Sequence, residues 1–270
     1  MKTFKIFHNT NKKSFDVAAE LRGKLVATGK FREAQDGEAE AEYVLSVGGD
    51  GRFLKSLRDC LVSDKVKFVG INTGTLGFLQ SVEPNGIDDL VTRLAQGTYK
   101  VQELSFIKCS VICEEGFSQV MHGLNELVIR AENLHILNLK IKIDGEELET
   151  YAGDGVLVAT STGSTAYNLS IGGSIVHETF HTLQLTPVAP LTTTVHSLQN
   201  PIVMPDGTLI EISPVKKSQD LLFSIDGYNS VVRDVRCLQI ELDKRRVNRI
   251  IVDEQNFWSK ISEKILRRGN

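Results

Sequence analysis

The spacing of apolar residues in the first hundred positions predicts strands that alternate with helices. Short runs of strand-forming residues stand at 3–7, 43–47 and 66–71. After each of them, apolar residues recur at steps of three and four, which is typical of helices that bury one face. This β-α-β-α-β-α order predicts an α/β domain built on a parallel sheet. Ligands bind such sheets at the carboxyl ends of the strands.

Local signals predict where these helices begin and end. Ser14 is expected to cap the first helix, whose apolar face begins at Phe15, and Gly29 is expected to stop it. The charged residues 32–42 are expected to form a loop. The second helix should run from Phe53 to about residue 61, and a third, around 90–95, should end at Gly97.

From about residue 101 the apolar positions alternate with a period of two. Residues 137–143 and 238–242 show the pattern clearly, and Asp-Gly dipeptides at 144–145, 206–207 and 226–227 are typical of hairpin turns. Repeated short strands with such turns predict an antiparallel β-rich domain. In the tail, Trp258, Ile261 and Ile265 return to helical spacing.

The chain is therefore predicted to form two domains. An α/β domain at 1–100 is joined by the C-terminal helix, 253–270, which is expected to pack back on it. A β-rich domain occupies 101–252. The basic stretch 244–249 is expected to be a solvated strand face of that domain rather than a nucleic-acid patch.

Composition narrows the class of protein. The 270 residues are 41% hydrophobic and carry a net charge of −3, so nothing in the charge favours nucleic acid as a partner. No apolar run is long enough for a membrane span, and the N-terminus is too short and too charged for a signal peptide. Cys109 and Cys113 lack the further ligands that a zinc site needs, so packed, reduced thiols are expected. A cytoplasmic location follows from this cysteine usage.

The first candidate site is Gly48-Gly49-Asp50-Gly51, between a predicted strand and a predicted helix. A glycine-rich turn in that position presents backbone N–H groups to a phosphate. Asp50 would repel a bare phosphate, so it fits a base for a hydroxyl group or part of a cation site. The alternative is an ordinary turn that needs glycine for positive φ angles. This stretch alone does not decide between the two.

Two stretches of the β-rich part also carry candidate chemistry. Asn125 and Glu126 precede an apolar strand; an amide can pair with an adenine edge, and a carboxylate can accept from vicinal ribose hydroxyls. Taken alone, these residues would more simply cap a loop. The run 153–170 has six hydroxyl side chains within 160–167, which would let donors approach a sugar-phosphate closely. The six histidines are dispersed without metal or catalytic spacing.

Together these stretches resemble the NAD kinase family in order and spacing along nearly the whole chain. The Gly-Gly-Asp-Gly motif by itself is shared with diacylglycerol-kinase-like lipid kinases, whereas its pairing with Gly-Ser-Thr-Ala-Tyr is specific. The resemblance implies an N-terminal α/β domain, a C-terminal β domain and a nucleotide site between them. The segments that carry it are Gly48-Gly49-Asp50-Gly51, Asn72-Thr73-Gly74-Thr75-Leu76-Gly77-Phe78, Asn125-Glu126, Gly153-Asp154-Gly155 and Thr162-Gly163-Ser164-Thr165-Ala166-Tyr167-Asn168.

The resemblance also implies a reaction: transfer of the terminal phosphoryl group of ATP, or of polyphosphate in some members, to the adenosine ribose 2′-hydroxyl of NAD. Asp50 matches the catalytic carboxylate, and Mg²⁺ or another divalent cation would accompany the donor. No metal site made by the protein alone is predicted. The implied phosphate-donor residues are Gly48, Gly49, Gly51 and Lys55, although Lys55 could also be an exposed helix lysine.

The implied NAD contacts divide between the two domains. Asn125 and Glu126 would contact the adenosine, and residues 165–167 would surround adenine and ribose. Asp154 would meet the nicotinamide end. The full implied set is Asp50, Gly51, Phe78, Asn125, Glu126, Ala152, Asp154, Thr165, Ala166, Tyr167, Asn168, Ser170 and Ala189.

The chain departs from the family pattern at a few positions. Ala152 stands where a basic residue is usual, and Tyr151 is a candidate to replace the lost contact. Ser161 replaces a usual proline, and Tyr228 a usual glutamine. Two other functions stay open, a non-catalytic NADP(H)-binding sensor and a lipid kinase, although an intact Asp50 favours the enzyme. A homodimer or homotetramer is expected by analogy alone.

Overall fold

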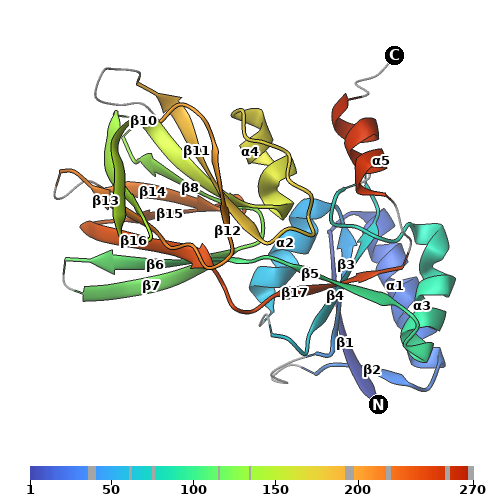
Figure 1. The fold of residues 1–270 in the computed structure, drawn as a ribbon. Helices are drawn as coiled ribbons and strands as arrows, with labels where there is room; N and C mark the ends of the chain where they lie inside the picture. The colour runs from blue at the N-terminus through green and yellow to red at the C-terminus, as the bar shows by residue number, and fades with distance from the viewer. Residues whose placement is uncertain are drawn as a thin grey trace. The chain divides into compact units, whose positions relative to one another are not determined.

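The computed structural model of the protein describes residues 1–35, 41–60, 63–74, 77–114, 116–133, 135–191, 198–216, 220–252 and 256–266. The chain forms two compact units (Figure 1). The first contains Met1–Glu103 and Arg245–Asn270, and the second contains Leu104–Lys244.

The first unit is built on a largely parallel sheet, as the strand-helix alternation predicts. Within the described part of this unit, six strands pair in the order β2-β1-β3-β4-β17-β5, and the pairs β1–β2, β1–β3, β3–β4 and β4–β17 are parallel. The strands are β1 (Lys2–His8), β2 (Phe31–Glu33), β3 (Tyr43–Gly48), β4 (Lys67–Asn72), β5 (Lys100–Leu104) and β17 (Val247–Ile251).

Helices cover both faces of this sheet. On one face, Leu21 of α1 and Leu90 of α3 belong to the same core cluster as Leu45 of β3. On the other face, Phe53 of α2 packs against Phe68 of β4, with ring centroids 6.2 Å apart. The helical segments are α1 (Lys12–Ala27), α2 (Asp50–Asp59), η1 (Pro84–Gly86), α3 (Ile87–Gln96), α5 (Phe257–Ile261) and the π-helical η3 (Ser262–Leu266).

Several predicted boundaries in this unit were wrong. Asn11, rather than Ser14, caps α1: its side chain accepts a hydrogen bond from the Ser14 N–H, and Ser14 itself is buried. Phe15, expected on the apolar face, is 58% exposed. Residues 31–33 form strand β2 because β1 pairs with them, although a loop was expected from 32; residues 36–40 lie outside the described residues.

The basic stretch 244–249 also differs from its prediction. The strand β17 pairs with β4 in the first unit, whereas these residues were expected on a solvated face of the β-rich domain. The Arg249 side chain is only 1% exposed and donates to the Phe78 carbonyl and to Gln102. A buried guanidinium is tolerated because its fork of N–H donors finds oxygen acceptors.

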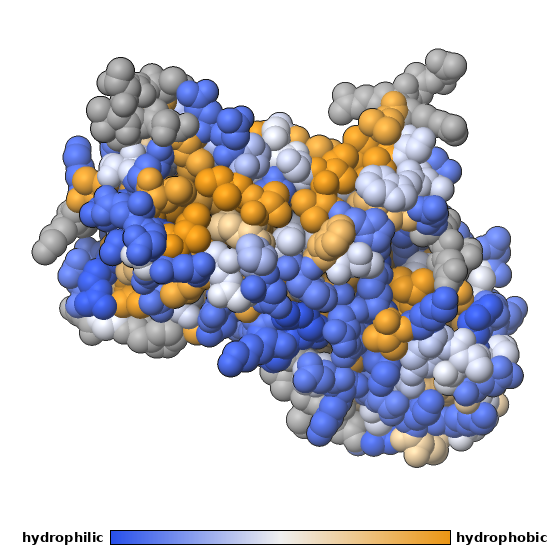
Figure 2. All heavy atoms as spheres, viewed as in Figure 1, coloured by the Kyte–Doolittle hydropathy of each residue, from blue (hydrophilic) through white to orange (hydrophobic). Residues whose placement is uncertain are grey.

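The C-terminal helix packs on the first unit, as predicted. Phe257, Lys260 and Ile261 are buried, and the Lys260 ammonium donates to the carbonyl oxygens of Phe78 and Gln80. Figure 2 shows hydrophobic surface over this C-terminal region, where Leu266 is 72% exposed. The tail beyond residue 266 lies outside the described residues.

The second unit is the predicted antiparallel β domain. In its described part, eleven strands form one sheet in which β15-β14-β8-β10-β9-β13-β16-β6-β7 are neighbours and β11 joins β10 to β12. The strands are β6 (Ile107–Cys113), β7 (Gly116–Gly123), β8 (Glu126–Ala131), β9 (Leu137–Ile143), β10 (Glu146–Thr160), β11 (Thr182–Pro190), β12 (Ile202–Pro205), β13 (Ile210–Pro214), β14 (Leu221–Ile225), β15 (Tyr228–Val232) and β16 (Val235–Leu242).

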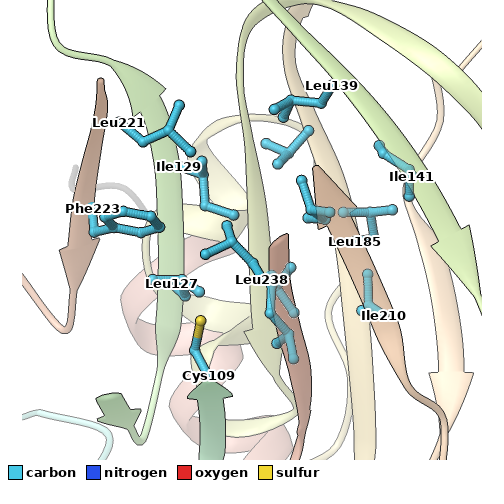
Figure 3. Packing of buried hydrophobic residues seen from close by; sticks show 14 of the residues in the cluster. Cys109, Leu127, Ile129, Leu139, Ile141, Leu185, Ile210, Leu221, Phe223 and Leu238 are labelled. Atoms are coloured by element: carbon cyan, nitrogen blue, oxygen red, sulfur yellow. The ribbon is translucent and has the colours of Figure 1, made fainter. Parts of the chain in front are cut away.

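Alternate residues of these strands form one large core. Figure 3 shows Leu127 and Ile129 of β8, Phe223 of β14 and Leu238 of β16 pointing toward one another, and all four are fully buried. Because successive side chains of a strand point to opposite faces, a sheet that buries one face needs apolar residues at every second position, as the sequence shows. The predicted fold class is therefore confirmed in both halves.

The turn dipeptides behave differently from one another. Asp144-Gly145 and Asp226-Gly227 each join paired strands, and all four residues have the positive φ angles of a type I′ turn. At 206–207 the expected hairpin was wrong, because β12 pairs with β11 while β13 pairs with β9 and β16. The same dipeptide signal therefore marks a turn, but not which strands pair.

The four cysteines are free thiols, and Cys109 is buried. Burial raises the pKa of the Cys109 thiol to about 12.

No helix in the described part of the chain is long and apolar enough to cross a membrane.

Candidate functional site

Gly48-Gly49-Asp50-Gly51 lies at the carboxyl end of β3, where the buried strand gives way to α2. Gly49 is the N-cap of the helix, and Asp50 is its first residue. The free N–H groups and the positive dipole end of a helix start attract negative charge. A side chain at Gly49 or Gly51 would meet no atom within 4 Å, so both backbones are open to a ligand.

The carboxylate of Asp50 is held in one place by the chain that follows β4. One oxygen accepts from the Phe78 N–H and the other from the Leu79 N–H, each at 2.9 Å. Each carboxylate oxygen keeps a further lone pair for a ligand. Gly77 makes this approach possible, because a Cβ there would lie 2.2 Å from an Asp50 oxygen. The predicted catalytic residue is thus oriented by neighbours 28 and 29 residues away.

Cations from the end of the chain hold the loop that carries Phe78. Arg249 and Lys260 both donate to the Phe78 carbonyl, at 3.1 and 3.3 Å. The Lys264 ammonium lies 4.5 Å from the Phe78 ring centroid, a cation–π distance. Burial lowers the pKa of Lys264 to about 8, and the negative charge of Asp50 acts in the opposite direction. Sequence reasoning placed Arg249 on a solvated strand face, and it missed Lys260 and Lys264 because no local motif contains them.

The other predicted residues of the first unit are placed as follows. Gly48 is buried, and a Cβ there would meet the Arg52 side chain at 2.6 Å. Lys55 is exposed on α2. Asn72 is buried and its amide donates to Glu83 at 2.9 Å. Thr75 and Leu76 of the same motif lie outside the described residues.

In the second unit, Asn125 stands just before β8 and its backbone is held on two sides. Its carbonyl accepts from the Thr160 N–H at 2.9 Å, and its N–H donates to Asp226 at 2.8 Å. The side-chain amide has no hydrogen-bond partner among the residues that the structure describes, so it is available to a ligand. The amide thus stands one residue before the start of β8, on a backbone that is held by Thr160 and Asp226.

Glu126 is the first residue of β8, and its side chain is 9% exposed. Burial, and secondarily the charge of Asp226, raise the pKa of Glu126 to about 8. The Oε2 atom is buried and has no hydrogen-bond partner in the described part of the chain. An unsatisfied buried carboxyl oxygen is costly, and a ligand hydroxyl would relieve that cost.

The hydroxyl-rich run forms a turn of 3₁₀ helix, η2 (Thr162–Thr165), followed by the short α4 (Tyr167–Ser170). Gly163 lies directly against Asn125: a Cβ there would be 2.0 Å from the Asn125 carbonyl oxygen. Thr165 and Ala166 are partly exposed, and Ser170 is exposed. The contact between Gly163 and Asn125 thus fixes the start of the segment that carries Thr165, Ala166 and Tyr167.

Two side chains of this run have firm partners within the unit. The Tyr167 hydroxyl accepts from Arg130 at 2.7 Å. Asn168 is fully buried, accepts from the Thr186 hydroxyl at 2.7 Å and donates to Gln184 at 3.3 Å. Asn168 therefore anchors α4 to β11.

The remaining predicted residues lie along β10 and at the end of β11. Ala152 is buried, whereas Asp154 is exposed. Ala189 is exposed and has a φ of 46°, which is uncommon for a residue with a Cβ. Tyr151, the candidate replacement for a basic residue, is 1% exposed, and its hydroxyl lies within hydrogen-bond distance of the Gly155 and Val188 carbonyls. Its hydroxyl is thus occupied by backbone, which argues against the replacement.

Asp226 is the residue of this unit that sequence reasoning treated only as part of a turn. Its carboxylate accepts from the backbone N–H groups of Leu124, Asn125 and Glu126. The Asp-Gly signal located the turn, but nothing local relates it to residues a hundred positions earlier. No group of three or more His, Cys, Asp or Glu side chains in the described residues is arranged to hold a metal ion.

Two family models match the chain. Residues 6–99 match the ATP-NAD kinase N-terminal domain, and residues 124–237 match the ATP-NAD kinase C-terminal domain. The NAD kinase of Finegoldia magna is 32% identical over 270 residues, which cover 98% of each chain. The NAD kinase of Bacteroides fragilis is 37% identical over 205 residues, 74% of this chain and 68% of that protein.

Solved structures share the fold. Yeast NADH kinase complexed with NADH superposes with a TM-score of 0.87 at 22% identity, covering 100% of this chain and 89% of that one. An NAD kinase from Archaeoglobus fulgidus in complex with ATP gives a TM-score of 0.75 at 22% identity, covering 97% and 98%. At this level of identity the likeness shows the arrangement of strands and helices.

Proposed function

The chain belongs to the ATP-NAD kinase family, and we propose on that basis that it transfers the terminal phosphoryl group of ATP to the adenosine ribose 2′-hydroxyl of NAD. The product is NADP. Polyphosphate is the alternative donor.

The observation that carries the proposal is the placement of Asp50. Phosphoryl transfer passes through a loose transition state, so orienting the hydroxyl and stabilising charge matter more than base strength. Asp50 has both oxygens fixed by backbone N–H groups, and it begins a helix whose Gly49 and Gly51 are open to a ligand. A rigid carboxylate beside free N–H groups suits a hydroxyl and a phosphate together. A non-catalytic NADP(H) sensor has no use for that carboxylate.

The donor would bring its own divalent cation. Mg²⁺ in such reactions is held by the phosphates and by one or two carboxylates, not by a cage of protein ligands. Asp50 keeps one lone pair on each oxygen and fits that limited role. The cation would neutralise charge on the transferred group, while Gly49 and Gly51 would offer backbone N–H groups.

The second unit would hold the NAD. The free amide of Asn125 and the unsatisfied oxygen of Glu126 would bind the adenosine, and Thr165, Ala166 and Tyr167 would lie beside it. Asp154 would contact the nicotinamide end. Asn168 would act by holding α4 rather than by touching NAD. Phe78, Ser170 and Ala189 remain predicted contacts of NAD, and Lys55 remains a predicted contact of the phosphate donor. A cytoplasmic location and a homo-oligomeric state also remain predictions.

The test is an assay of the purified protein with NAD, ATP and Mg²⁺ that measures NADP. We expect NADP to form, and its absence with ATP and with polyphosphate would refute the proposal. Asp50→Asn should lower turnover by orders of magnitude while NAD still binds in a calorimeter. Equal loss of binding and turnover would instead make Asp50 a structural residue.

A further inference from the structure

The feature of interest is the turn between β14 and β15, whose Asp226 reaches back to the start of β8. One Asp226 oxygen accepts from the Leu124 N–H at 2.7 Å, and the other accepts from the N–H groups of Asn125 and Glu126 at 2.8 and 3.3 Å. In return, the Asp226 N–H donates to the Glu126 carbonyl at 3.1 Å. Three consecutive N–H groups are thus satisfied by one carboxylate.

The opposite side of the same segment is held by the end of β10. The Thr160 hydroxyl donates to the Leu124 carbonyl at 2.6 Å, and the Thr160 N–H donates to the Asn125 carbonyl at 2.9 Å. Residues 124–126 therefore have their N–H groups on Asp226 and two of their carbonyls on Thr160. The backbone is fixed on both sides, while the Asn125 amide is left for a ligand.

We propose that Asp226 is a positioning residue of the NAD site, which holds the backbone of Asn125 and Glu126 so that their side chains face the adenosine. The inference rests on the proposed function, because it assigns Asp226 to the same NAD site. A residue at this turn has to combine a positive φ with two acceptor oxygens. Aspartate meets both needs, since short polar residues tolerate the left-handed region and a carboxylate accepts several N–H groups.

Asp226 also acts on Glu126 through its charge. Of the charged groups in the described residues, Asp226 is the one that adds to burial in raising the pKa of Glu126 to about 8. Glu126 can accept from ribose hydroxyls at both oxygens only when it is ionised. Removing the Asp226 charge should therefore lower the pH at which Glu126 becomes a full acceptor.

The experiment compares Asp226→Asn with a matched control, Asp144→Asn. Asp144 occupies the same position in another Asp-Gly turn, has a φ of 51°, and accepts from the Leu209 N–H at 2.8 Å. Asparagine keeps one acceptor oxygen and tolerates the positive φ. For wild type, both variants and Glu126→Gln, the Kd for NAD is measured by calorimetry from pH 6 to 9. The free energy of unfolding of each protein is measured by urea denaturation.

We expect Asp226→Asn to raise the Kd for NAD about ten- to a hundredfold, as the loss of one or two hydrogen bonds to a charged acceptor would. The pH midpoint of binding should also move below that of wild type. Asp144→Asn should leave both quantities unchanged. An unchanged Kd and midpoint in Asp226→Asn, with Glu126→Gln weakened, would overturn the positioning role. If Glu126→Gln bound NAD like wild type, the proposed NAD site itself would be refuted.

Discussion

The raised pKa of Glu126 makes the stability of the protein depend on pH in an unusual direction. The pKa rises from an ordinary 4.5 to about 8, because the carboxyl is buried and lies near Asp226. Between pH 4.5 and about pH 8, Glu126 is therefore protonated in the folded protein and ionised in the unfolded chain. Stability falls as pH rises through this window, and the loss is complete above pH 8.

The size of the effect follows from the difference between the two pKa values. Each unit of difference is worth about 1.4 kcal/mol. Ionising buried Glu126 thus costs the folded state about 5 kcal/mol at most, and relaxation of the site lowers that figure. Glu126→Gln removes the titration and keeps the shape of the side chain. Between pH 5 and pH 9, the variant should gain about 2–5 kcal/mol relative to wild type.

The assay is urea denaturation followed by circular dichroism at several pH values. Other groups titrate equally in both proteins, so the difference between them isolates Glu126. Glu146→Gln, which removes an exposed carboxylate on β10, serves as the control and should follow wild type. Parallel pH profiles for wild type and Glu126→Gln would show that Glu126 is ionised in the folded protein at neutral pH, which would contradict the raised pKa.

Three further changes test other contacts. Tyr167→Ala should weaken NAD binding measured by calorimetry, whereas Tyr167→Phe, which loses only the 2.7 Å bond from Arg130, should weaken it less; an equal Kd in Tyr167→Ala and wild type would count against the adenosine site. Gly163→Ala should lower the thermal midpoint and raise the Kd for NAD, because its Cβ would lie 2.0 Å from the Asn125 carbonyl oxygen; a variant with wild-type values in both would contradict that packing. Gly23→Ala, at an exposed position inside α1 where a Cβ meets nothing within 4 Å, should stabilise the protein by about 0.5–1 kcal/mol in urea denaturation. A loss of stability in Gly23→Ala would show that a methyl group is not accommodated at this position of α1.

Local features of the chain were readable because they depend on neighbours in sequence. Gly97 ends α3 with a φ of 74°, as the stop signal predicted. The Asp144-Gly145 and Asp226-Gly227 hairpins follow from the same kind of short-range rule. At the cap of α1 the short-range rule failed: Ser14 was expected to cap the helix, whereas Asn11 does so and accepts a hydrogen bond from the Ser14 N–H.

Partners far apart in sequence could not be read in this way. Arg249 looked like part of a solvated basic stretch, yet β17 inserts beside β4 and buries it. Nothing local to Asn168 showed that β11 brings Thr186 and Gln184 to its side chain. Each of these roles depends on which strands pair, and a strand's own residues do not specify its neighbour.

The sequence by itself indicated the family and the two kinds of domain and predicted the candidate site residues, because these depend on period, turn residues and motif spacing. Only the tertiary structure decided how those residues are held. In the folded chain the N–H groups of Phe78 and Leu79 donate to the Asp50 carboxylate. The N–H groups of Asn125 and Glu126 donate to the Asp226 carboxylate. Hydrogen bonds between segments some 30 to 100 residues apart arise from sheet pairing, and sheet pairing is a property of the whole fold.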